Sequence, residues 1–199
     1  MALKAANDNS MSNITALPSG VSAKSMILLA TETASSSDAI SFTSNIDDTY
    51  KEYIFKFYDI HPETNDANFQ VNFRDGGSSY DATKTTTFFR AYHTEAGSSG
   101  LEYRTANDLA QGTGVATLNI GTGNENDECL AGTLQLFAPS STTFVKHFIA
   151  DTNLYEGGDN SHRAFVAGYC NVTAAIDGVQ FAMSSGEIQG GTIQMFGVL

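Results

Sequence analysis

The sequence predicts an all-β fold, a jelly-roll-like antiparallel β-sandwich preceded by an extended N-terminal arm. Charged residues make up only 16% of the 199 positions, and Ser, Thr, Asn and Gly are abundant. This composition favours strands joined by polar turns. From Ser25 onward, short apolar runs alternate with turn residues at the spacing typical of a sandwich or barrel. Because 41% of the residues are hydrophobic, the chain can bury one substantial core, and residues 25–199 are predicted to form a single domain.

Several strands are recognised from their local patterns. The segment 50–60 is apolar on both faces, as in a strand central to a packed sheet, and Pro62 ends it because proline cannot extend a ladder. Alternation in 68–74 places Phe69, Val71 and Phe73 on one face. The full set of predicted strands is 25–34, 39–44, 50–60, 68–74, 86–94, 114–120, 130–138, 143–150, 162–171, 178–183 and 188–196.

The connections between these strands carry turn signals. The first two strands flank Ser-Ser-Ser-Asp at 35–38, which predicts a hairpin, and the glycines of 75–80 suit a tight reversal. The segment 103–112 is at most one or two helical turns. This many strands cannot form one open sheet without exposing a large apolar face, so two facing antiparallel sheets are expected.

Residues 1–24 differ from the rest of the chain. Small and polar side chains dominate this segment, and its two lysines outnumber its single aspartate. Such a segment cannot bury a core of its own, so we expect it to be either flexible or extended along a partner.

The charge balance excludes several classes of function. The chain has a formal net charge of −12 and no cluster of Lys or Arg that would neutralise neighbouring phosphates, which argues against nucleic-acid binding. No run of 18 apolar residues predicts a membrane span. Cys129 and Cys170 are the only cysteines. They form either two free thiols or one disulfide.

No catalytic or metal motif stands out. The four histidines, at 61, 93, 147 and 162, lie in different segments, and no nucleophile elbow marks a catalytic triad. Acids at 45–50, 123–128 and 156–160 would serve a glycan-cleaving enzyme only if two carboxylates met across the sugar. Oxygen ligands for Ca²⁺ are available in the loop 123–128, although their order matches no known calcium loop: Asn124, Glu125, Asp127 and Glu128. We therefore predict no enzyme and no cofactor.

Sugar binding is the alternative that the loops leave open. The chain has no Trp, so tyrosines such as Tyr92, Tyr103 and Tyr155 are the aromatic residues available to stack on a sugar ring. Core packing accounts for most of the 13 phenylalanines. The candidate recognition residues are Asn124, Glu125, Asp127 and Tyr155.

Two segments carry a resemblance. The C-terminal sequence 179–199, VQFAMSSGEIQGGTIQMFGVL, resembles the C-terminal signature of structural proteins from tailed bacteriophages, especially phages of marine bacteria. The segment 53–80 is similar to a strand-loop-strand of the same virion proteins. Phe196 departs from the signature, in which tyrosine is more usual. The matching residues are Phe181, Ser184, Ser185, Gly186, Ile188, Gly191, Thr192, Ile193, Phe196 and Gly197.

The resemblance implies a non-enzymatic virion structural protein on the surface of a phage particle. Its place would be either a tail fibre or tail tip, or the outside of the capsid as a decoration protein. Its partners would be major capsid or tail proteins, and a tail position would add recognition of a host-surface glycan. By analogy we expect a homo-oligomer, with a trimer as the first expectation. The alternative is a glycan-binding module or a weak glycan depolymerase.

The end of the chain has a near copy within it. GTIQMFGVL at 191–199 repeats the pattern of GTLQLFAP at 132–139. In each, the two aliphatic residues share one face of a strand and Thr, Gln and Phe share the other. We expect the terminal copy to be the closing strand of the sandwich, buried between neighbours, with Phe181, Ile193 and Met195 in the core.

Overall fold

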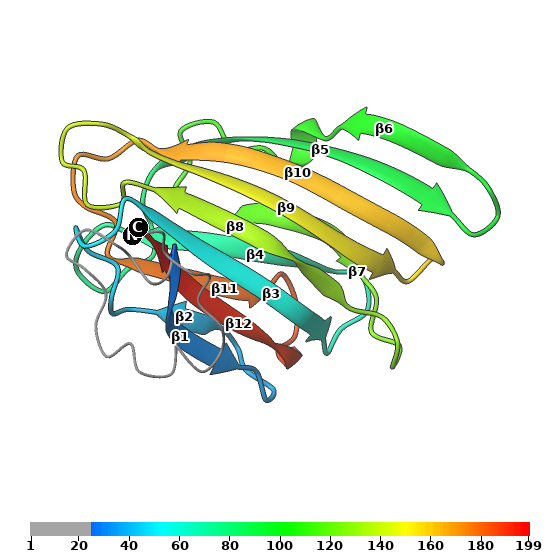
Figure 1. The fold of residues 1–199 in the computed structure, drawn as a ribbon. Coiled ribbons are helices and arrows are strands. Elements are labelled where there is room, and N and C mark those ends of the chain that lie inside the picture. Colours follow the sequence, from blue (N-terminus) through cyan, green and yellow to red (C-terminus); the bar gives the residue numbers. More distant parts are fainter. Residues whose placement is uncertain (1–24) are drawn as a thin grey trace, which may run out of the picture.

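A computed structural model describes residues 25–199, and the N-terminal arm predicted for 1–24 lies outside the described residues. The predicted all-β, jelly-roll-like antiparallel sandwich is confirmed (Figure 1). The described residues contain twelve strands and one short 3-10 turn, η1 (Thr105–Asn107). The strands are β1 (Met26–Thr33), β2 (Ile40–Phe42), β3 (Glu52–Pro62), β4 (Ala67–Arg74), β5 (Lys84–Thr94), β6 (Ser99–Tyr103), β7 (Ala116–Thr122), β8 (Leu130–Phe137), β9 (Lys146–Glu156), β10 (Asn160–Cys170), β11 (Gly178–Met183) and β12 (Ile188–Val198).

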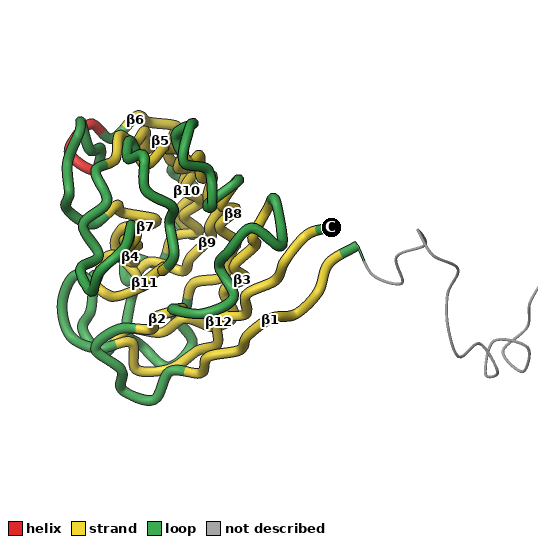
Figure 2. The backbone as a smooth tube through the Cα atoms, turned by 90° about the vertical axis from the view of Figure 1, so that its left-hand side faces the viewer, coloured by secondary structure: helices red, strands yellow, loops and turns green. Residues whose placement is uncertain are grey.

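The strands form two layers, which Figure 2 shows from one end of the molecule. The large sheet has the order β6-β5-β10-β9-β8-β3-β12-β1, and the small sheet has the order β7-β4-β11-β2. Every pairing is antiparallel. The pair Thr122–Glu156, between β7 and β9, joins the two sheets along one side. On the other side, the bridge between Ser37 and Ile188 ties the β1–β2 connection to β12, so the sandwich is nearly a closed barrel.

The core lies between the two layers and is rich in phenylalanine. Phe55 and Phe57 of β3 meet Phe181 of β11 with ring centroids 5.4 and 5.1 Å apart. Phe69 of β4 stacks on Phe181 from the same small sheet. These side chains are buried, as the alternation of 68–74 predicts for Phe69. Edge-to-face packing of such rings stabilises the contact between the layers beyond the area that they bury.

The two Gly-Thr strands flank the same neighbour. β12 and β8 pair with opposite edges of β3. Ile193 and Met195 of β12 are fully buried beside β3, as are Leu134 and Leu136 of β8. Phe181, from the small sheet, faces them across the core. The terminal strand therefore lies between β1 and β3 rather than at an edge.

Both Gly-Thr segments begin with a glycine for steric reasons. A side chain at Gly132 would place its Cβ 2.4 Å from the Asp151 carbonyl oxygen. At Gly191, where φ is +112°, it would lie 2.7 Å from the Asp59 carbonyl oxygen. Gly132 pairs with Phe57 of β3, and Gly191 lies at a register shift in the pairing of β12 with β3. Each glycine thus allows a close approach of backbone, which belongs to β9 at Gly132 and to β3 at Gly191.

The predicted hairpin at 35–38 is wrong. Within residues 25–199, β1 pairs only with β12, and β2 pairs with β11 in the small sheet. The connection crosses from one layer to the other and is held by backbone hydrogen bonds to β12, including Ala34 N to Gly191 O at 2.9 Å. A serine-rich turn can join two paired strands or cross between the two layers. β2 belongs to the small sheet because Ile40 and Phe42 bury their side chains there.

Two further differences concern strand content. β6 was not predicted, because Ser99–Tyr103 is short and contains one strongly apolar residue, Leu101. β9 runs to Glu156, six residues beyond its predicted end. The 103–112 segment contains a single 3-10 turn, as expected.

Within residues 25–199 no helix is long and apolar enough to cross a membrane.

Candidate functional site

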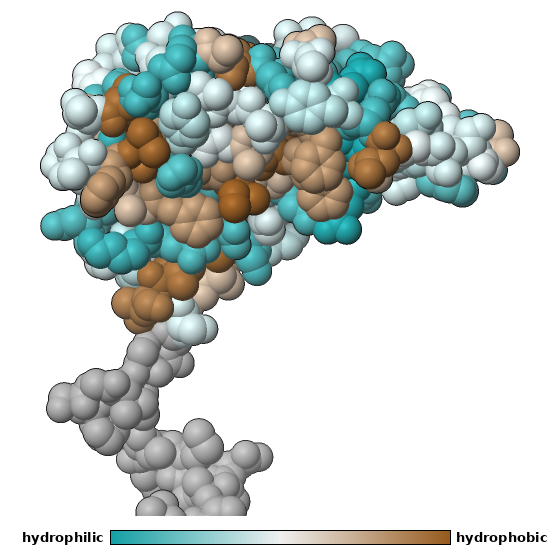
Figure 3. Space-filling model, turned by 90° about the horizontal axis from the view of Figure 1, so that it is seen from above, coloured by the Kyte–Doolittle hydropathy of each residue, from teal (hydrophilic) through white to brown (hydrophobic). Residues whose placement is uncertain are grey.

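The outer face of the large sheet carries side chains that the core does not use. Burial alternates along most of β5, β10 and β9, because every second residue of a strand points away from the small sheet. Their pairing is continuous over eleven residues. This gives a rigid surface on which the register fixes the neighbours of each side chain. Figure 3 shows apolar side chains gathered among hydrophilic ones on the upper surface of the molecule.

One part of this surface is an apolar strip, which we define as Leu101, Tyr103, Phe89, Phe165 and Ile149. Tyr103, Phe89 and Phe165 are direct cross-strand partners on β6, β5 and β10. The Phe89 and Phe165 rings stack with centroids 5.0 Å apart. Leu101 is 74% exposed, Tyr103 54%, Ile149 48% and Phe89 41%. Contiguous exposed apolar side chains are a feature that many interaction surfaces share.

Small side chains create shallow hollows beside the strip. Ala167 and Thr87 lie between Phe89 and Phe165 on one side and Tyr169 and His147 on the other. The resulting hollows have volumes of about 280 and 340 Å³. The surface at the strip is therefore uneven as well as apolar.

A second part of the outer face is polar, and we call it the polar trough. It consists of three hollows of about 570, 390 and 190 Å³ that share lining residues. Asn153 lines the first two, and His93 and Ser161 line the last two. The trough therefore crosses β8, β9, β10 and β5. Its side chains are Thr133, Asp151, Asn153, Tyr155, Ser161, Arg163, His93 and Glu95.

Hydrogen bonds fix the floor of the trough. Arg163 donates to both carboxylate oxygens of Asp151, from Nε at 2.9 Å and from Nη2 at 2.6 Å. This pair raises the pKa of the Arg163 guanidinium. Asn153 Nδ2 donates to Ser161 Oγ at 3.3 Å and to the His162 carbonyl oxygen at 3.2 Å. Side chains held in this way present their remaining polar atoms in a defined direction.

The predicted recognition residues gather at the same end of the sandwich but not in one site. Tyr155 belongs to the polar trough, and its hydroxyl donates to Asp159 Oδ1 at 3.0 Å. Asn124 instead bonds to the β3–β4 turn through its side-chain donor to the Glu63 carbonyl oxygen. Glu125 forms a local turn with Glu128, and Asp127 lies in the same exposed loop.

The calcium alternative gains no geometric support. Glu128 Oε2 accepts a hydrogen bond from the Glu125 backbone at 2.6 Å, and a side chain on Gly123 would collide with its carboxylate. In residues 25–199 no group of three or more His, Cys, Asp or Glu side chains is arranged to hold a metal ion. The loop carboxylates are used locally or face solvent.

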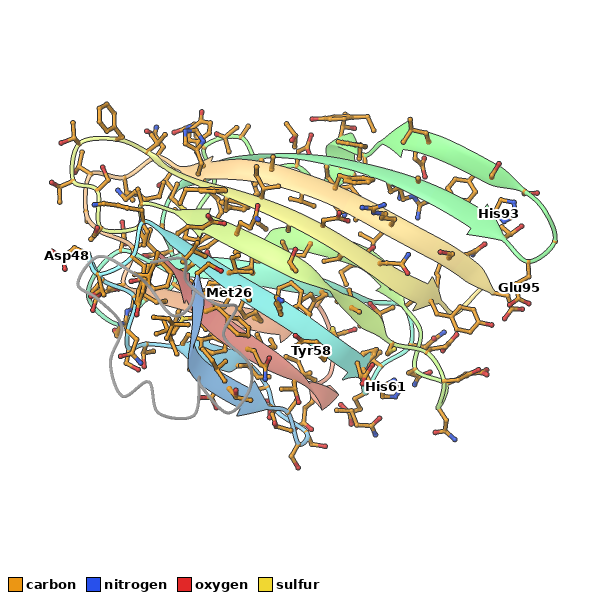
Figure 4. All side chains as sticks on the ribbon, in the orientation of Figure 1. Met26, Asp48, Tyr58, His61, His93 and Glu95 are labelled. Atoms are coloured by element: carbon orange, nitrogen blue, oxygen red, sulfur yellow. The ribbon has the colours of Figure 1, made fainter. Side chains whose placement is uncertain are left out.

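Acids from the two loops considered for glycan cleavage do not meet. Asp47 bonds to Tyr53 at the start of β3, whereas the Glu128 carbonyl oxygen lies 2.6 Å from His61 Nδ1 at its other end. The eleven residues of β3 separate the loops by roughly 30 Å. Figure 4 shows Asp48 and His61 at opposite ends of the molecule.

The four histidines lie in different surroundings. His93 and His147 are exposed on the outer face, and His61 is half-buried against the loop 123–129. His162 is fully buried on the inner face of β10. Burial lowers the pKa of His162 to about 4, and the neighbouring Arg90 guanidinium adds to this effect.

A buried cationic cluster lies at the opposite end of the core from the loop 123–129. Lys146, Cys170 and Lys84 are direct cross-strand partners on β9, β10 and β5. The Lys84 ammonium donates to the Gly114 carbonyl oxygen, and that of Lys146 to the Val172 carbonyl oxygen, both at 2.6 Å. Burial lowers the pKa of Lys84 to about 8 and raises that of the Cys170 thiol to about 12.

This cluster has a structural role in the described chain. Each buried ammonium group donates to at least one loop carbonyl, which meets the need of a buried polar group for a hydrogen-bond partner. The thiol beside them is protonated and buried, so it is a poor nucleophile. Cys129 and Cys170 are both free, which settles the alternative left open by the sequence.

Several residues of the outer face were missed by sequence reasoning. Phe89 and Phe165 were not distinguished from the phenylalanines that core packing explains, and Arg163, Asp151 and Asn153 were not singled out. One signal was available. Phe88 and Phe89 are adjacent in a strand, so only one of them can face the core.

Comparison with known proteins adds no relative. The sequence matches no protein-family model, and no curated protein is significantly similar to it.

Proposed function

We propose that the protein is a non-enzymatic structural protein of a tailed-bacteriophage particle, displayed on the particle surface and acting through contacts. The observation that carries the proposal is the apolar strip. Its side chains contribute little to the core, yet Phe89 and Phe165 are stacked and Leu101 is largely exposed. A partner that covers such a surface gains free energy from its burial.

The strip suits assembly with other virion proteins or with copies of the same chain. It extends onto β6, the edge of the large sheet, and Arg163 and Asp151 neutralise each other beside it. A locally neutral apolar patch permits association despite the net charge of −12. Both a tail position and a capsid-decorating position are compatible with this surface, and we propose a trimer as the assembled state.

Purified particles and the purified full chain test this proposal. We expect the chain to be a component of phage particles, detectable by mass spectrometry and by density in a particle map. A Leu101→Ser/Phe89→Ser variant should fold but lose incorporation at least tenfold and sediment as a monomer. Gln135→Ser, on the same face outside the strip, is the control. Absence of the chain from particles, or full incorporation of the double variant, would overturn the proposal.

A further inference from the structure

The polar trough and the apolar strip adjoin on one rigid face, but they have different chemistry. Arg163 lies beside Phe165 with its guanidinium carbon 4.7 Å from the ring centroid. At the far side of the trough, Tyr155 follows Asn153 on the outer face of β9. One aromatic ring, that of Tyr155, therefore lines the trough beside a hydrogen-bonding floor formed by Asp151, Arg163 and Asn153.

The floor retains polar atoms that no described residue uses. Asn153 donates two hydrogen bonds through Nδ2, and its Oδ1 accepts none from residues 25–199. Arg163 bonds to Asp151 through Nε and Nη2, which leaves Nη1 available. An acceptor and a donor thus lie side by side, each held by bonds on its other side. Such preorganised groups lose little conformational entropy when they bind a ligand.

The main chain restricts what can occupy the trough. β8, β9, β10 and β5 are paired on both edges where the trough crosses them, so a peptide cannot add a strand there. A ligand must bind through side chains alone. The four strands span roughly 14 Å across the sheet, which is room for two or three sugar rings in a row.

The charge around the trough selects against anions. The hydrogen bond to Asp159 is the largest of the effects that raise the pKa of Tyr155 to about 12, and the carboxylates of Glu95 and Asp127 add to it. Figure 4 shows Glu95 and His93 at the same end of the molecule. Uronic acids, sulfated sugars and phosphates would meet this negative field.

We propose that the polar trough binds a neutral saccharide chain. Pyranose rings present a C–H face, which suits Tyr155, and a rim of hydroxyls that both donate and accept hydrogen bonds, which suits Asn153, Asp151 and Arg163. The inference rests on the proposed function in one respect, because a surface position on a particle would expose the trough to the glycans of a bacterial envelope.

Affinity electrophoresis of the full chain tests the proposal. The probes are neutral polysaccharides (dextran, mannan and galactan) and the acidic polysaccharide alginate. We expect retardation by at least one neutral polymer and none by alginate. Asn153→Ala should weaken the retarding interaction at least tenfold, as should Tyr155→Ala, whereas Tyr155→Phe keeps the ring and should retain most of it.

Gln135→Ala is the matched control, since it removes a polar side chain from the same face outside the trough. Circular dichroism shows whether each variant is folded. The proposal is overturned by a folded wild-type chain that no neutral polymer retards, by a stronger effect of alginate, or by binding that Asn153→Ala leaves unchanged.

Failure of this inference is distinguishable from failure of the proposed function. A chain that incorporates into particles but binds none of these polymers overturns the saccharide site alone. A chain that binds a neutral polymer in the trough but is absent from particles overturns the virion assignment alone.

Discussion

The two faces of the large sheet are built from the same strands, but one is buried and the other is exposed. On the inner face, Phe148 is fully buried and packs against Phe73 at a centroid distance of 4.9 Å. On the outer face, its neighbour Ile149 remains 48% exposed. Burial gives the inner side chains their contribution to folding, since hydrophobic stabilisation scales with the area removed from water. The outer side chains remain available for a partner.

This difference separates what holds the molecule together from what it offers to others. A phenylalanine on the inner face is explained by the core. The Phe89–Phe165 stack is not, because the strand would form with polar residues at those positions. Comparing matched substitutions on the two faces therefore tests the division directly.

The largest expected effect is a buried charge on β12. Ile193→Asp places an unpaired carboxylate in the core and should cost more than about 4 kcal/mol, enough to abolish soluble folded protein. Gln194→Asp introduces the same residue one position later, on the outer face opposite Lys56, and should be tolerated. Soluble yield and thermal denaturation measure both. Wild-type melting of Ile193→Asp would contradict the placement of β12.

Truncation of adjacent residues on β9 gives the next contrast. Phe148→Ala removes a fully buried ring and should destabilise the protein by about 3–5 kcal/mol. Ile149→Ala should change the free energy of unfolding by no more than about 0.5 kcal/mol. Urea denaturation measures each value. Equal losses would show that the outer face is part of a second core.

Acid should reveal the buried imidazole of the inner face. Because the pKa of His162 is about 4 in the folded protein and near 6.5 when unfolded, the unfolded chain binds a proton first as the pH falls. Stability should therefore drop between pH 6.5 and 4, by about 2 kcal/mol from pH 7 to pH 5.

Substitution tests whether His162 causes this loss. The charged groups that act on its imidazole are Arg90, Glu102 and Arg104, and they are retained in every variant. In His162→Gln the free energy of unfolding should be nearly constant from pH 7 to pH 5. His93→Gln, on the outer face, should keep the wild-type dependence. An unchanged slope in His162→Gln would assign the acid sensitivity to other groups.

The smallest effect is expected for the ion pair of the outer face. Asp151→Asn weakens the bond to Arg163, and both side chains are about half exposed. Exposed pairs contribute less than about 1 kcal/mol, so the melting temperature should move by only a few degrees. A much larger loss would mean that the floor of the polar trough is needed for folding.

Much of the fold was predictable from the sequence, and its exceptions have physical causes. Alternation placed Phe69, Val71 and Phe73 in the core, where all three are buried. The predicted hairpin at 35–38 is wrong because packing between the two layers selects which strands pair. The local turn residues carry no information about that packing. β6 was not predicted because the prediction relied on apolar runs, and a five-residue edge strand needs little apolar content.

The candidate site was less predictable than the fold. Tyr155 was identified as an available aromatic residue and does line the polar trough. Its neighbours there come from β8, β10 and β5, which are far apart along the chain. Asn124, Glu125 and Asp127 lie in a polar loop at the same end, where composition alone indicated solvent exposure.

The sequence by itself determined the all-β class, the position of most strands and the burial of Ile193 and Met195, because alternation along a strand is a local property of the chain. Only the tertiary structure decided which strands are neighbours. That choice aligns Phe89 with Phe165 and Asp151 with Arg163, and it places β12 and β8 on opposite edges of β3. Register between distant strands depends on the joint packing of two layers, which no single segment encodes.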